Sequence, residues 1–191
     1  MLFTHDAEVA LHGAVALVNT MAGSVPGDTD PDRLTTPDEL DAFVVEWSWT
    51  GDRAVGTQAR ARELAAVRAL RPRLRELWPL DEDGIVDAVN ALLREGRALP
   101  QLVRHDAWDY HLHATPPQAP LGTRMAVEAA MAIVDVIRAG ELDRLRECEA
   151  VDCDNVLIDL SKNRSRRFCE SGCGNRSNVA AYRARRSAAT S

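Results

Sequence analysis

The positions of apolar residues along the chain predict a mainly helical protein. In four segments, apolar residues recur every three or four positions, the period of a helix with one buried face: 6–21, 37–47, 57–78 and 83–94. The segment 121–139 is apolar on nearly all sides. This helix is therefore expected in the middle of a bundle or at the seam of a homodimer.

Local signals mark where some of these helices begin or end. Thr36 can cap the second helix, Pro37 suits its first position, and Glu39 completes a capping box. Pro72 lacks a backbone donor and is expected to kink or interrupt the third helix. The Pro, Gly and Asp residues within 23–31 indicate a loop.

Residues 98–114 follow a different pattern, in which alternating apolar positions predict two short strands around Asp106 and Ala107. His111 and His113 would share one strand face and, together with His105, could bind a metal or an acidic ligand. No third ligand stands at a motif spacing that supports a metal site. Alternation alone also explains the two histidines as part of a half-exposed strand face.

Three more residues of this helical region are candidates for ligand binding. Trp47 and Trp49 lie close to Gly51, where the second helix is expected to end, and they could line a pocket or fill the core. Asn19 is a polar residue at the end of an apolar helix. It could contact a ligand, or it could hydrogen-bond a neighbouring loop.

The bulk composition limits the class of protein. A length of 191 residues allows one substantial domain and a small appendage, and a hydrophobic content of 46% can bury a core. No uninterrupted run of about 18 apolar residues is present that could span a membrane. The first residues lack the basic start and apolar core of a signal peptide, so a cytoplasmic protein is expected.

All four cysteines lie near the C-terminal end, as the pairs Cys148/Cys153 and Cys169/Cys173, with fifteen residues between the pairs. Two close pairs and a moderate spacer are what a tetrahedral zinc site needs, so one Zn²⁺ per chain is predicted. Two disulfides would suit a secreted chain, which the N-terminal residues do not indicate. Unlinked core cysteines, or a redox switch in which oxidation releases zinc, are the other interpretations.

A basic segment overlaps the second cysteine pair. From Leu160 to Arg186 there are eight cations and one acid, a net charge of +7 in a chain whose net charge is −6. This asymmetry predicts a surface for a polyanion, and the adjoining zinc site favours nucleic acid. Surface solvation and compensation of the zinc thiolates would explain only two or three of these cations. The candidate DNA contacts are Lys162, Arg164, Arg166, Arg167, Arg176, Asn178, Arg183 and Arg185.

The cysteines are expected to sit on a hairpin and a helix. Residues 156–160 alternate like a strand that returns from the first pair, and the second pair lies at the start of a helix over 175–187. Val179, Tyr182 and Phe168 are expected to form the small core of this treble-clef-like finger. The predicted fold class is mainly α (α+β): an N-terminal helical domain with a short β-hairpin, followed by a small four-cysteine zinc finger.

Two sets of residues carry a resemblance to known families. The segment 161–169 (SKNRSRRFC), followed by Cys-Gly-Asn-Arg at 173–176, resembles the CGNR zinc finger. The residues 17–20 (LVNT) and the segment 33–40 resemble the ABATE domain, which precedes this finger in bacterial, stress-linked transcription regulators. The resemblance implies a sensor domain at 1–140, a DNA-binding finger at 141–191, and zinc on the four cysteines.

Two classes of function follow from these observations. The first is a zinc-dependent DNA-binding transcription regulator whose N-terminal domain senses a small molecule or a stress signal. The alternative is a small-molecule-binding or redox-responsive protein whose finger is structural or binds another protein. An enzyme is not expected, because no serine nucleophile motif, phosphate loop or spaced carboxylate pair occurs. A zinc ion held by four cysteines also has no open coordination position.

Overall fold

The computed structural model describes residues 2–21, 32–104, 109–151 and 153–188. The predicted loop at 23–31, His105, and the turn at Asp106 and Ala107 lie outside the described residues. The predicted fold class is confirmed, since helices dominate and two small hairpins accompany them. None of the described helices is long and apolar enough to cross a membrane.

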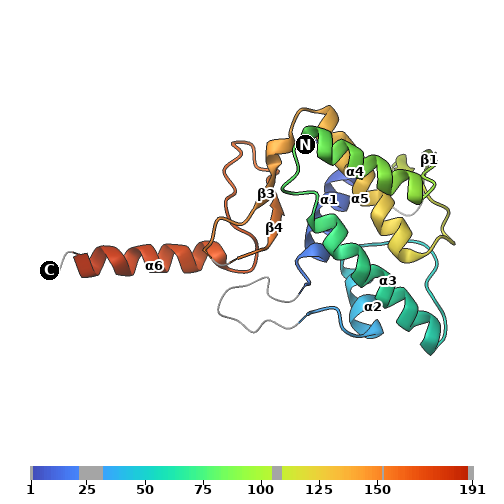
Figure 1. Cartoon of the computed structure of the whole chain (residues 1–191), viewed down its shortest axis with the longest axis horizontal. Helices are drawn as coiled ribbons and strands as arrows, with labels where there is room; N and C mark the ends of the chain where they lie inside the picture. Colours follow the sequence, from blue (N-terminus) through green and yellow to red (C-terminus); the bar gives the residue numbers. More distant parts are fainter. Residues whose placement is uncertain (1, 22–31, 105–108, 152, 189–191) are drawn as a thin grey trace.

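The elements of the described chain fall into a helical body and a C-terminal extension. They are, in order, α1 (His5–Val18), α2 (Pro37–Glu46), α3 (Thr57–Arg75), α4 (Glu82–Glu95), β1 (Gln101–Val103), β2 (His111–His113), α5 (Leu121–Arg138), the 3₁₀ turn η1 (Leu142–Arg144), β3 (Leu145–Glu147), β4 (Val156–Ile158) and α6 (Cys173–Ala188). Figure 1 shows α1 to α5 gathered in one body, with β3 and β4 between this body and α6. Each pair of strands, β1 with β2 and β3 with β4, is antiparallel.

The local signals read from the sequence largely hold. The Thr36 hydroxyl accepts from the backbone N–H of Glu39 at 3.2 Å, and the Glu39 carboxylate accepts from the N–H of Thr36 at 2.9 Å, so the predicted capping box is confirmed. Pro72 does not interrupt α3, which continues to Arg75. The carbonyl of Arg68, which lies four residues before Pro72, instead accepts from Nε of Arg71 at 3.5 Å.

Helix α5 is the centre of the hydrophobic core. It packs against α1, α3 and α4, and its residues Met125, Ala129 and Ile133 are 0% exposed. A helix that is apolar all round needs cover on every side, and the chain's own helices supply much of it. Of the two places expected for this helix, the middle of a bundle is therefore the one observed.

Strand β4 joins the helical body to the C-terminal finger. Val156 and Ile158 belong to the core of the helical body, whereas Leu157 packs against the cysteines. The side-chain amide of Asn19 pairs with the outer edge of β4: its Nδ2 donates to the Val156 carbonyl, and its Oδ1 accepts from the Val156 N–H, both at 2.9 Å. The indole Nε1 of Trp78 also donates to the Leu157 carbonyl at 3.0 Å. Asn19 thus takes the place of a further strand.

Replacing Asn19 with alanine should destabilise the junction between helical body and finger. The change leaves both backbone groups of the buried Val156 without their partner, so we expect a loss of about 2–4 kcal/mol in the free energy of unfolding. Urea denaturation followed by circular dichroism measures this loss. Asn90→Ala, at an exposed site on α4, is the matched control and should change stability by less than about 0.5 kcal/mol. Equal stability of the two variants would contradict the proposal that Asn19 holds β4 against the helical body.

Candidate metal centre, basic helix and ligand cavity

The sulfur atoms of Cys148, Cys153, Cys169 and Cys173 all lie within 4.8 Å of one another, and all four residues are buried. The Sγ of Cys173 lies 3.4 Å from that of Cys169 and 3.5 Å from that of Cys153. Zinc–sulfur bonds of about 2.3 Å in a tetrahedron place the sulfurs about 3.8 Å apart. The donor set therefore fits a tetrahedral zinc ion, as the cysteine spacing predicts. Within the described chain, this cluster stands out as the group of metal-binding side chains close enough to share an ion.

Hydrogen bonds donated by backbone N–H groups hold the two cysteine pairs close to each other. Cys148 directly follows β3, and its N–H donates to the Asn155 carbonyl at 2.9 Å, next to β4. The N–H of Cys153 closes a turn onto the Ala150 carbonyl at 3.2 Å. From the second pair, the N–H of Cys169 donates to the Sγ of Cys148 at 3.4 Å, and Cys173 is the first residue of α6.

Polar groups around the sulfurs favour their ionised form. Nη2 of Arg176 donates to the Sγ of Cys173 at 2.9 Å, and Nδ2 of Asn155 donates to the Sγ of Cys169 at 3.4 Å. Four thiolates and Zn²⁺ carry a formal charge of −2, which the guanidinium would partly offset. Arg176, a predicted DNA contact, therefore lies in the surroundings of the metal site.

Without a metal, burial opposes the ionisation of three of the thiols, those of Cys153, Cys169 and Cys173. Burial raises the pKa of Cys153, and it raises the pKa of Cys173 to about 11. Burial also opposes ionisation of Cys169. Hydrogen bonds to its sulfur, first among them the one from Asn155, outweigh the effect of burial and lower the pKa of Cys169 to about 7. A divalent cation would displace the thiol protons, and its binding would then stabilise the finger.

We expect one zinc ion per chain and loss of the finger's order when the metal is removed. Metal analysis of purified protein measures the stoichiometry, and cobalt exchange should give the absorption bands of tetrahedral thiolate coordination. Cys173→Ser should weaken zinc retention because the hydroxyl is a poor ligand. Far-UV circular dichroism should still report α1 to α5 in this variant. Protein that binds no zinc or cobalt would contradict the assignment.

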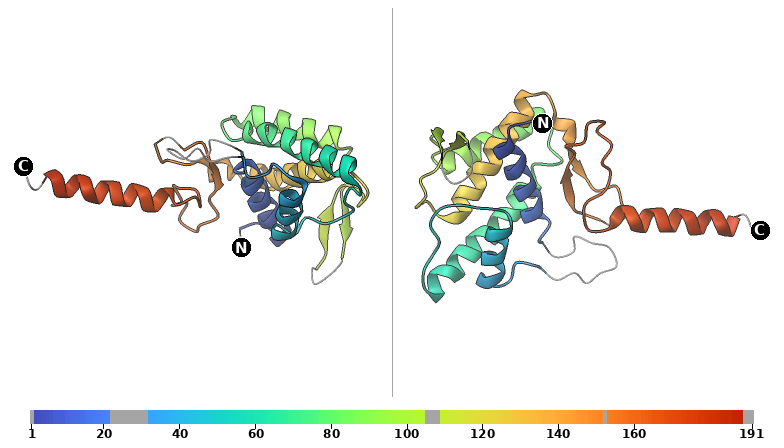
Figure 2. Two further views of the ribbon diagram at one scale, coloured as in Figure 1. Left: turned by 90° about the horizontal axis from the view of Figure 1, so that it is seen from below. Right: turned by 180° about the vertical axis from the view of Figure 1, so that it is seen from behind.

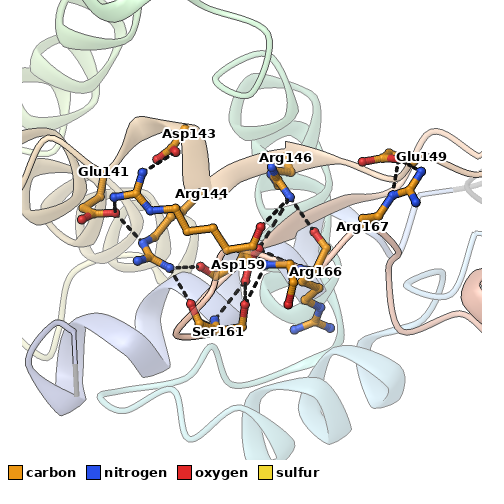
Figure 3. Close-up of polar contacts among 11 residues, drawn as sticks. Glu141, Asp143, Arg144, Arg146, Glu149, Asp159, Ser161, Arg166 and Arg167 are labelled. Carbon is orange, nitrogen blue, oxygen red and sulfur yellow. Dashed lines mark hydrogen bonds and ion pairs between the residues drawn. The ribbon is translucent and has the colours of Figure 1, made fainter.

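Most of the predicted DNA contacts before α6 are paired with carboxylates of the finger, and Figure 3 shows one such pair, Arg167 with Glu149. Arg164 contacts both Glu141 and Asp143, at 2.8 and 2.6 Å. Arg167 contacts Glu149 at 2.5 Å. Arg166 contacts Glu170 at 2.7 Å. Lys162 is exposed in the same loop.

A buried carboxylate organises this loop from within. Asp159 is 0% exposed and accepts hydrogen bonds from Ser161 and from the backbone N–H of Arg166, as Figure 3 shows. Burial alone would raise the pKa of Asp159, but these bonds and the charge of Arg146 lower it overall. The buried Arg144 donates to the carbonyls of Asp159 and Ser161 at 2.7 and 3.0 Å. Arg144 and Arg146, which precede the loop, thus help to hold it in shape.

Helix α6 projects from the finger with no other helix or strand of the described chain beside it, and the views of Figures 1 and 2 agree on this. Val179 and Tyr182 are 43% and 55% exposed, so the prediction that they form the finger's core is wrong. That core consists of the four cysteines, Leu157 and the partly buried Ala150 and Phe168. The sequence could not show this, because two apolar residues at helical spacing suggest a buried stripe whether or not a partner surface exists.

Basic residues of α6 are exposed along its length. Arg183 and Arg185 are exposed, and no carboxylate lies within ion-pair distance of either in the part of the chain that the structure describes. The guanidinium of Arg186 lies 6.0 Å from the centre of the Tyr182 ring. Asn178 is exposed on the same helix. Arg183 and Arg185 therefore give α6 positive charge that no carboxylate of the described chain pairs with.

A cavity of about 650 Å³ lies in the helical body, between α1, α5, β2 and the segment after α2. Its lining includes four of the predicted ligand-binding residues: Trp47, Trp49, His111 and His113. Asn19 does not line it, because its amide is engaged with β4. Asn19 and Trp47 instead help to line a second cavity of about 290 Å³ between the body and the finger. Trp47 thus borders both cavities.

The two histidines are joined in one hydrogen-bond arrangement. Their Nε2 atoms lie 3.0 Å apart, and Nδ1 of His111 lies 2.8 Å from the carbonyl oxygen of Asp109. A carbonyl only accepts, so Nδ1 of His111 carries a proton. In the neutral pair, Nε2 of His111 therefore accepts from Nε2–H of His113. His105, the third member of the proposed set, lies outside the described residues.

Sequence reasoning missed the three carboxylates that line this cavity, Asp6 of α1 and Glu128 and Asp135 of α5. Burial raises the pKa of Glu128 to about 7, against the opposing charge of Arg124. Burial also raises the pKa of Asp135, opposed by Arg138 and reinforced by Asp6. The signal was present, because two acids seven positions apart on an otherwise apolar helix share one face.

Glu128→Gln should stabilise the protein at alkaline pH. The native carboxyl keeps a proton that the unfolded chain releases between its ordinary pKa of 4.5 and about 7, so ionisation costs stability as pH rises through this window. We expect a gain of about 2–3 kcal/mol at about pH 8 and little change at about pH 4. Urea denaturation at both pH values measures it. Glu76→Gln, at an exposed site, is the control. A gain of equal size at both pH values would contradict the burial argument.

Two family models match the chain. The ABATE model, whose description reads "Putative stress-induced transcription regulator", matches residues 11–140. The CGNR zinc finger model matches residues 144–186, which contain the four cysteines. No curated protein matches the chain.

Proposed function

The chain belongs to the ABATE family and carries a CGNR zinc finger, and on this basis we propose that it is a zinc-dependent, DNA-binding transcription regulator. The zinc would hold the finger in shape and take no part in catalysis, because four cysteines fill a tetrahedral site. The N-terminal cavity would receive a small molecule. A cavity of about 650 Å³ has the size typical of small-molecule sites.

The proposal of DNA binding rests mainly on the exposure and charge of helix α6. This helix is exposed and projecting, and it contains four arginines and no acidic residue. The width of an isolated helix suits the major groove of DNA, and guanidinium groups suit phosphates and guanine edges. Arg183, Arg185 and Arg186 would supply phosphate contacts, whereas Asn178 lies nearer the metal end and could reach a base.

The salt dependence of DNA affinity should locate the contacts on α6. Each phosphate contact contributes about −0.9 to the slope of log K against log salt. The triple variant Arg183→Ala, Arg185→Ala, Arg186→Ala should therefore flatten the slope by about 2.7 if all three contact phosphates. Fluorescence anisotropy with labelled genomic fragments, repeated over a series of salt concentrations, measures the slope.

Two control variants separate local contacts from net charge. Arg62→Ala, Arg73→Ala, Arg94→Ala removes three exposed charges from α3 and α4 and should leave the slope unchanged. Arg164→Ala, Arg166→Ala, Arg167→Ala removes arginines that are already paired with carboxylates, so its slope should change by less than that of the α6 variant. An unchanged slope in the α6 variant would reject the proposed contact surface.

The ion pairs of the finger also support the second class of function, in which the finger is structural or binds a protein. They use three of the predicted DNA contacts for internal structure. Under this alternative, DNA retention would be weak, independent of sequence, and insensitive to the α6 variant. The same anisotropy series therefore distinguishes the two proposals.

A further inference from the structure

The cavity of the helical body combines apolar walls with an excess of negative charge. Its lining includes three carboxylates, those of Asp6, Glu128 and Asp135, and one guanidinium, that of Arg138. Arg138 is exposed, at the end of α5. Asp6 accepts from the N–H of Leu112 at 3.5 Å. The charges that line the cavity thus leave a surplus of negative charge for an occupant to balance.

Among the carboxylates of this lining, Glu128 is the one whose ionisation burial opposes most strongly, since burial raises its pKa to about 7. It is partly buried in the middle of α5, and no ion pair or hydrogen bond to it occurs among the residues that the structure describes. The charge of Arg124, on the preceding turn, lowers the pKa of Glu128, but the two residues form no ion pair in the described chain. The Arg124 guanidinium donates to the carbonyls of Pro117 and Asp52, at 2.9 and 2.8 Å. A partly buried carboxylate without a counter-ion is costly, and a bound cation would remove that cost.

The remaining walls suit the body of an organic cation. Trp47 and Trp49 contribute aromatic surface, which attracts cations through the negative faces of the rings. Val44, Met131 and Ala132 contribute aliphatic surface. His111 and His113, which also line the cavity, are hydrogen-bonded to each other through their Nε2 atoms.

From these observations we infer that the cavity binds an organic cation with an apolar body, such as an aromatic amine, and that Glu128 is its counter-ion. The inference rests on the proposed sensing role of the same cavity. A neutral apolar ligand would leave the ionised form of Glu128 uncompensated, and an anion would add a like charge. A hydrated inorganic cation would leave the apolar walls uncovered.

Three ligands with the same naphthyl frame test this inference: naphthylmethylammonium, naphthylmethanol and naphthoate. Isothermal titration calorimetry with the zinc-loaded full chain measures the affinity of each. We expect the ammonium to bind about tenfold more tightly than the alcohol, because only the ammonium can form an ion pair with Glu128. Such a pair is stronger in a partly buried site than in water. Naphthoate should bind most weakly. Equal affinity of ammonium and alcohol, tightest binding of naphthoate, or no binding of any of the three would overturn the inference.

Glu128→Gln tests the named counter-ion. The variant keeps the shape of the side chain and should abolish the preference for ammonium over alcohol, whereas Glu76→Gln should keep it. Because the pKa of Glu128 is about 7, ammonium affinity should rise with pH through neutrality in the wild-type chain and not in Glu128→Gln. A preference that survives in Glu128→Gln would reject Glu128 as the counter-ion.

These results are separable from those of the DNA experiment. Loss of the ammonium preference with an intact α6 salt dependence would reject the ligand class and leave the regulator proposal standing. A preference for ammonium without DNA binding would support the ligand class and reject the DNA-binding proposal. It would favour a small-molecule-binding protein with a structural finger.

Discussion

The arrangement of the whole molecule depends on a three-residue strand that packs between two cores. Val156 and Ile158 of β4 are buried in the helical body, and Leu157 packs on the cysteines from the other side. Asn19 covers the outer edge of β4 with two hydrogen bonds. Because β4 belongs to both cores, the finger cannot turn freely against the helices. The direction in which α6 projects is therefore set by the packing of α1 and β4.

The distribution of charge in space differs from its distribution along the chain. The segment from 160 to 186 is strongly basic, but residues 141–191 contain ten cations and eight acids in total. Carboxylates that precede the first cysteine pair, such as Glu141 and Asp143, pair with Arg164 beyond the hairpin. The folded finger is thus close to neutral near the four cysteines and basic along α6. If the chain binds DNA as proposed, long-range attraction would depend on that helix more than on the loop.

Features fixed by neighbouring residues could be predicted from the sequence, and features fixed by distant contacts could not. The capping box of Thr36, the period of α5 and the cysteine spacing are local, and all three were found in the structure. The role of Asn19 depends on a partner 137 residues away. The exposure of Tyr182 depends on the absence of a covering element beside α6 in the described chain, and periodicity carries no information about that. Glu128 and Asp135 could be predicted only in part, because the sequence shows their spacing on α5 but not their burial in the cavity.

Under the proposed sensing role, the two cavities would link a bound effector to the finger. Trp47 borders both cavities, and α1 passes from the first cavity, at Val9 and Ala10, to Asn19 at the edge of β4. A ligand can shift the finger only by the difference in its affinity for two positions of these walls. The Asn19–Val156 pair resists any such shift, because separating it would leave two buried backbone groups unpaired. An effector would therefore act by moving α1 and β4 together as one unit, and α6, attached through the metal, would follow.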